Sequence, residues 1–97
     1  MQISIDLTLT LPTLPARIEW YSVGRAARVC GATPTAVRYW TKEMQIPVRR
    51  TSGNDRRYSR LQVLRLAALN RLIEMYGVRP HQAWAMAVEA IPREVQP

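Results

Sequence analysis

Cysteine and histidine are nearly absent from this sequence, which has one of each, Cys30 and His81. A single cysteine forms no internal disulfide, which fits a reducing compartment such as the cytoplasm. Cys30 falls on the apolar side of its expected helix, which favours a small core residue over a reactive or metal-binding thiol. His81 has no second candidate ligand nearby, so we expect no metal site and no cofactor.

Long apolar runs are missing too, because no stretch approaches the roughly 18 residues of a membrane span. The first 15 residues also lack the basic and apolar segments of a signal peptide. No paired carboxylates, catalytic triad, glycine-rich phosphate loop or metal-ligand spacing is present, so we do not expect an enzyme. The length of 97 residues suits one domain with its own core.

Acidic residues are few, with seven against fourteen basic ones, and the net charge is +7. Residues 17–60 hold ten basic and three acidic side chains, so they carry the whole excess. All but one of the basic residues are arginines, which suit bidentate contacts to phosphate and guanine. We therefore expect a polyanionic partner. An anionic membrane surface would require a basic face beside a lipid-facing apolar face, whereas these positions follow a helix-turn-helix pattern.

The chain is organised around residues 31–44. Thr33 is a strong N-cap and Pro34 suits the first helical position, which predicts a helix to about Met44. Helical periodicity gives it an apolar face of Ala36, Val37, Trp40 and Met44. The opposite face carries side chains that reach bases and phosphates in a DNA major groove: Thr35, Arg38, Tyr39 and Lys42. The alternative is an ordinary amphipathic helix with a solvated basic face.

A shorter helix precedes this one. Ser22 can cap a helix over Val23–Cys30, which Gly31 would end. Arg25 and Arg28 point away from its apolar face, so they can approach the same duplex as the second helix. Two helices joined by a short glycine-containing turn form the helix-turn-helix pattern.

A short hairpin follows, because residues 48–51 and 55–58 flank the turn signal Ser52-Gly53-Asn54. This predicts a wing that carries four arginines: Arg49, Arg50, Arg56 and Arg57.

Two further helices are expected after the wing. Ser59 and Gln62 form a capping box for a helix to about Tyr76. Its apolar stripe is Leu61, Leu64, Ala68, Leu72 and Met75. Arg65 lies within the apolar arc and either snorkels to the surface or reaches DNA beside the wing. A last helix over residues 80–90 has an inner face of Ala83, Trp84, Ala87, Ala90 and Ile91.

Residues 3–11 alternate apolar and polar side chains without a break, which predicts a strand with one buried face. The apolar row is Ile3, Ile5, Leu7, Leu9 and Leu11. Pro12 and Pro15 end it and begin a linker that runs to Trp20. The row could pair with a neighbouring subunit head-to-tail along DNA, pack on its own core, or remain a disordered arm.

Residues 21–91 resemble the winged helix-turn-helix domain of the MerR family. The resemblance rests on Tyr-Ser-Val-Gly-Arg-Ala-Ala (21–27), Gly-Ala-Thr-Pro-Thr-Ala-Val-Arg-Tyr-Trp (31–40), Arg-Arg-Tyr-Ser (56–59) and Tyr-Gly-Val-Arg-Pro (76–80). It implies that Arg38 and Tyr39 of the recognition helix, with Arg56 and Tyr58 of the wing, contact double-stranded DNA. Trp40 and Thr41 depart from the Tyr-Glu that the family usually has, which affects base preference.

The resemblance also implies a division of the chain into domains and a choice between two functions. We expect an N-terminal strand and linker over residues 1–19, a winged helix-turn-helix domain over 20–91 and a tail over 92–97. The sequence has no counterpart of the long dimerisation helix and effector domain of typical MerR regulators, so no small-molecule effector is expected. Small stand-alone winged helices of this kind also resemble phage excisionases, so the leading hypothesis is a phage excisionase in the cytoplasm of a bacterial host. Such proteins bind and bend attachment-site DNA and direct an integrase toward excision. The alternative is a small transcription regulator without an effector domain.

Overall fold

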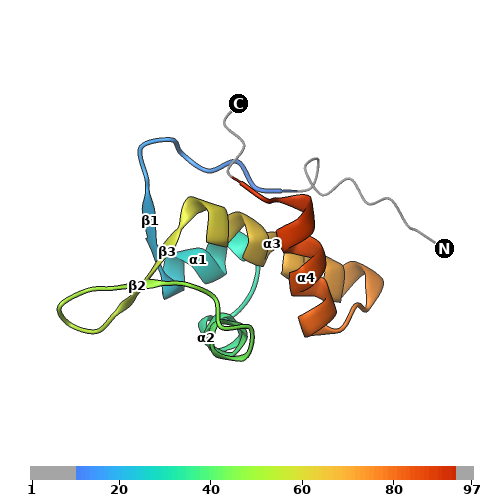
Figure 1. The fold of residues 1–97 in the computed structure, drawn as a ribbon. Helices are drawn as coiled ribbons and strands as arrows, with labels where there is room; N and C mark the ends of the chain where they lie inside the picture. The colour runs from blue at the N-terminus through green and yellow to red at the C-terminus, as the bar shows by residue number, and fades with distance from the viewer. Residues whose placement is uncertain (1–10, 94–97) are drawn as a thin grey trace.

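The structure, a computed structural model, describes residues 11–93, which form a mainly helical fold with one small sheet (Figure 1). Its helices are α1 (Val23–Cys30), α2 (Pro34–Glu43), α3 (Arg60–Tyr76) and α4 (Pro80–Ala90). Its strands are β1 (Trp20–Ser22), β2 (Arg49–Arg50) and β3 (Arg56–Ser59). The strand expected over residues 3–11 lies outside the described residues except for Leu11, which forms a bend and packs half-buried against the core.

Three helices begin at the caps that the sequence indicates. The side chains of Ser22, Thr33 and Ser59 each accept a hydrogen bond from the amide three residues later, at 3.1 to 3.2 Å. Gly31 ends α1 in the left-handed conformation at φ 72°, which a glycine adopts without strain. The expected capping box of α3 is half formed, because Oε1 of Gln62 is buried without a hydrogen-bond partner among the described residues.

The sheet is antiparallel and has the strand order β1-β3-β2. The hairpin of β2 and β3 confirms the predicted wing. The sequence did not predict β1, which pairs with the other edge of β3 and places Tyr21 opposite Tyr58. Both tyrosines face the core, so the wing is joined to the body of the domain through a buried aromatic pair.

The core forms around α3, which packs against both α1 and α4 (Figure 1). Its fully buried apolar positions include Val63, Leu66 and Leu69, which the predicted stripe did not contain. Met75, which that stripe did contain, is 56 % exposed. A single-sided stripe was the wrong pattern, because a helix between two neighbours buries a wider arc than one face.

Arg65 does not lie at the wing, because its guanidinium extends to the end of α4. Its Nε donates to the carbonyl of Ile91 at 2.8 Å, and its Nη2 donates to the carbonyl of Pro92 at 3.1 Å. These carbonyls follow the C-terminus of α4, where a cation is favourable. On α4 itself Ala83 and Ala87 are fully buried, whereas Ala90, expected on the inner face, is exposed.

Residues 12–19 were expected to be a linker, but they pack on the domain. Leu14 belongs to the core cluster. The guanidinium of Arg60 is buried and donates to the carbonyls of Leu14, Pro15 and Ile18. The first residue of α3 therefore fastens the segment that leads into β1, and β1 in turn supports β3 of the wing.

Candidate nucleic-acid interface

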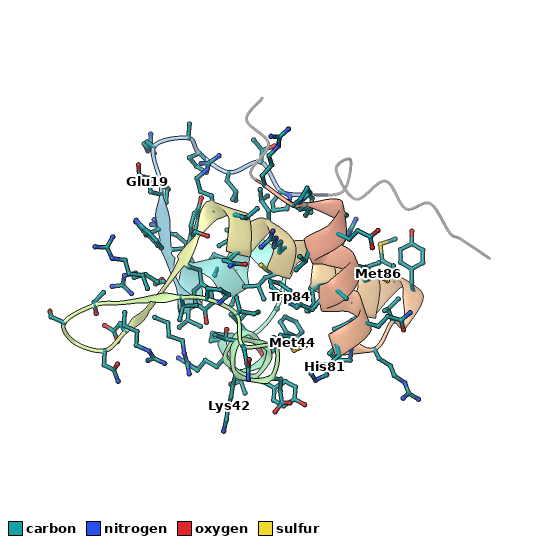
Figure 2. The ribbon with its side chains drawn as sticks, in the orientation of Figure 1. Glu19, Lys42, Met44, His81, Trp84 and Met86 are labelled. Carbon is teal, nitrogen blue, oxygen red and sulfur yellow. The ribbon has the colours of Figure 1, made fainter. Side chains whose placement is uncertain are left out.

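Helix α2 has the two faces that its sequence predicts. Val37 and Trp40 are buried in the core, while the opposite face is exposed and consists of Thr35, Arg38, Tyr39 and Lys42. Figure 2 shows Lys42 pointing away from the body of the protein. Next to Lys42, at the C-terminal end of α2, Glu43 lies 3.8 Å from His81 at the start of α4, and both side chains are exposed. The cationic face is therefore free over most of the helix.

A groove of about 480 Å³ separates α2 from the wing, and we call it the inner groove. It is lined by Ser22, Val23, Arg38, Arg50, Asn54, Asp55, Arg56 and Arg57. The fold thus brings Arg38 of the recognition helix together with three wing arginines that lie 12 or more residues away in sequence. Asp55 is the one acidic residue of the lining, so the groove is strongly cationic.

The wing arginines differ in how they are held. Nη1 of Arg50 donates to the carbonyl and the side-chain oxygen of Asn54, at 3.2 and 3.4 Å, so Arg50 braces the turn. Asn54 has a φ of 66°, which asparagine tolerates better than most residues. Nη1 of Arg57 donates to the carbonyl of Arg56 at 3.2 Å. Nε of Arg56 is buried and has no acceptor within residues 11–93.

Tyr58 requires a correction, because its side chain is 0 % exposed and does not reach the DNA-facing surface. Its hydroxyl lies 2.7 Å from Oγ1 of Thr41, which donates its own proton to the carbonyl of Val37 at 2.6 Å. A threonine hydroxyl has one proton, so Tyr58 must be the donor to Thr41. The pair links β3 to α2, and it therefore fixes the wing relative to the recognition helix.

The remaining predicted residues lie outside the inner groove. Arg25 and Arg28 are exposed on α1. Arg49 lies on the other side of the wing, with its guanidinium carbon 5.4 Å from the ring centroid of Trp20. Within the predicted self-association row, Ile3, Ile5, Leu7 and Leu9 lie outside the described residues.

Cys30 is confirmed as a core residue. Its thiol is buried, donates to the carbonyl of Val63 at 3.5 Å, and has its pKa raised by burial to about 12. Within residues 11–93 no group of three His, Cys, Asp or Glu side chains is placed to hold a metal ion. The same part of the chain contains no helix with the length and apolarity needed to cross a membrane.

A family model described as the MerR HTH family regulatory protein matches residues 21–83. The chain belongs to the MerR HTH family. No curated protein matches it significantly. Among solved structures, it is similar to the crystal structure of HiNmlR, a MerR family regulator lacking the sensor domain, bound to promoter DNA. The identity is 22 %, the TM-score is 0.59, and the match covers 77 % of this chain and 57 % of that one. The MerR-type fold predicted from sequence is confirmed.

Proposed function

We propose that this protein binds duplex DNA, with α2 in the major groove and the wing against the adjacent backbone. The observation that carries the proposal is the inner groove, where Arg38 of α2 and the wing arginines converge on one cationic surface. The family and the promoter-bound similar structure support it. The proposed role involves no catalysis, cofactor or small-molecule effector.

The exposed residues divide between two tasks. Arg38 and Lys42 project from one face of α2, and such side chains hydrogen-bond to base edges. Thr35 and Tyr39 share that face and add contacts to bases or sugars. The phosphates are then held from both sides of α2 by Arg25, Arg28, Arg50, Arg56 and Arg57.

Two biological roles use this same binding step. The matched family consists of regulatory proteins, and the similar structure is a regulator on promoter DNA, which favours a transcription regulator. The excisionase hypothesis rests on the resemblance to small stand-alone winged helices, and none of the comparisons bears on it. In both roles the apolar side chains of Ile3, Ile5, Leu7 and Leu9 are proposed to join neighbouring subunits head-to-tail. Leu11, predicted for the same row, packs instead against the core of its own domain.

The test is footprinting of the protein on its own upstream region and on any integrase attachment region near its gene. Protection of one promoter site that disappears with Arg38→Ala supports a regulator. Protection of several tandem sites, with stimulated excision in vitro, supports an excisionase that assists an integrase. Unspecific binding that is unchanged by Arg38→Ala would contradict the proposed interface.

A further inference from the structure

Two buried hydroxyls form a hydrogen-bonded chain from the wing into the recognition helix, and we call this chain the hydroxyl relay. Tyr58 on β3 donates to Oγ1 of Thr41 on α2 at 2.7 Å, and Thr41 donates to the carbonyl of Val37 at 2.6 Å. Tyr58 is fully buried and Thr41 is 6 % exposed, so water does not compete for either bond. Within residues 11–93 no other hydrogen bond joins α2 to the sheet, because α2 packs mainly on α1.

The two ends of the hydroxyl relay lie next to two of the proposed DNA contacts. The carbonyl of Val37 belongs to the peptide group that joins Val37 to Arg38, which projects from the exposed face of α2. At the other end, Tyr58 directly follows Arg57 in β3. Arg38 and Arg57 both line the inner groove. The relay therefore connects the backbone of the proposed base-reading arginine with the backbone of a proposed phosphate ligand.

We propose that Thr41 and Tyr58 are positioning residues for DNA recognition, which make the base contact of Arg38 depend on the phosphate contacts of the wing. The inference rests on the proposed function, in which α2 and the wing meet one duplex. A wing held at a fixed distance from α2 meets its phosphates only when α2 lies at one depth and angle in the major groove. Arg38 then reaches base edges in a single register, since hydrogen bonds tolerate little displacement. Neither hydroxyl touches DNA in this arrangement.

Removing one hydroxyl should reduce sequence selectivity more than general affinity. Tyr58→Phe lets the wing meet phosphates without fixing α2, so the two surfaces are no longer preorganised for one site. The measurement is fluorescence anisotropy of the full chain on the duplex that the parent selects from a randomised pool, and on a scrambled duplex. We expect roughly two- to twelvefold weaker binding to the selected duplex, the equivalent of one buried hydrogen bond, and a smaller change on the scrambled duplex.

A double variant tests whether the two hydroxyls act as one unit. Thr41→Val removes the same bond as Tyr58→Phe, so the combined variant should bind no more weakly than either single variant. General destabilisation would instead add the two losses. Thr41→Ser keeps a hydroxyl at this position and should bind like the parent. Tyr58→Phe keeps the buried ring, so it carries the test if Thr41→Val does not fold.

Tyr21→Phe is the matched control for the loss of a buried tyrosine hydroxyl. Tyr21 is paired with Tyr58 across the sheet, and its hydroxyl is buried without a partner among the described residues. The control removes the same atom from the same sheet but breaks no link to α2. It should therefore bind both duplexes like the parent, in samples that circular dichroism shows to be folded.

Several results would overturn the inference and leave the proposed function standing. One is parent-like binding of Tyr58→Phe to both duplexes while Arg38→Ala weakens binding to the selected one. Another is an equal loss in Tyr21→Phe, or a loss in Thr41→Ser as large as in Thr41→Val. Equal weakening on the selected and scrambled duplexes, or additive losses in the double variant, would also count against positioning. If the parent binds neither duplex, the proposed function itself is wrong.

Discussion

The hydroxyls of Tyr21 and Tyr58 offer an internally controlled test of how the wing is attached. The two residues are paired across β1 and β3, and their side chains are 1 % and 0 % exposed. The hydroxyl of Tyr58 is bonded to Thr41, whereas that of Tyr21 is buried without a partner in the described part of the chain. Replacing each by phenylalanine removes one oxygen from nearly the same environment.

The expected effects differ in sign. Tyr58→Phe removes a buried hydrogen bond, which should lower the free energy of unfolding by about 0.5 to 1.5 kcal/mol. Thr41 keeps its bond to Val37, which limits the loss. Tyr21→Phe removes a hydroxyl whose burial is uncompensated, so it should be neutral or stabilising by about 1 kcal/mol. In a domain of this size, 1 kcal/mol corresponds to about 4 to 8 °C in Tm.

The measurement is urea unfolding of both variants and the parent, followed by circular dichroism. A double-mutant cycle with Thr41→Val isolates the hydroxyl pair, and we expect a coupling of at least about 0.5 kcal/mol between positions 41 and 58. The corresponding cycle with Tyr21 should show none. Equal destabilisation by the two phenylalanine variants would refute the assignment of the buried bond.

Four further outcomes are expected. Arg38→Ala should cost about 1 to 3 kcal/mol of DNA binding and relax specificity at one or two base pairs, measured by competition with scrambled duplex. Log affinity should fall with log salt at a slope of about −4 to −5, and Arg57→Gln should flatten it by about one without changing the preferred sequence. Burial raises the pKa of Cys30 from 9.0 in the unfolded chain to about 12 in the folded protein. The free energy of unfolding should therefore fall as the pH rises between these two values, and the fall should be shallower in Cys30→Ala. Deleting residues 1–10 should leave a folded domain that binds one site but loses cooperativity on tandem sites; an unfolded product would assign these residues to the core.

Local signals in the sequence were sufficient for most of the fold. Capping residues such as Thr33 and Ser59 act within three residues of themselves, so the starts of the helices could be predicted without tertiary information. The wing followed from a turn signal between two short extended stretches. Strand β1 was missed because three residues are too few to show alternation, and its partner β3 begins 36 residues after it.

The errors at the site have two different causes. The burial of Tyr58 was only half available in the sequence. Strand periodicity places Tyr58 on the same face as Arg56, but it does not say which face of the wing meets the body of the domain. The burial of Arg60 was not predictable from the sequence. Its hydrogen-bond acceptors are backbone carbonyls of residues 14–18, and every residue has such a carbonyl whatever its side chain. Backbone acceptors have no residue signature, so a buried arginine of this kind is indistinguishable in sequence from a DNA-binding one.

Because a buried arginine cannot be told from a DNA-binding one in the sequence, the number of basic residues overestimates the number of phosphate contacts. Residues 17–60 contain ten basic side chains, and ten phosphate contacts would give a salt slope near −9. Arg60 is buried against the N-terminal segment, and Arg38 and Lys42 are assigned to bases. The proposed phosphate ligands on α1 and in the inner groove number about five, which corresponds to a slope of about −4 to −5. A slope near −9 would therefore mean that nearly every basic residue meets a phosphate, which the buried position of Arg60 contradicts.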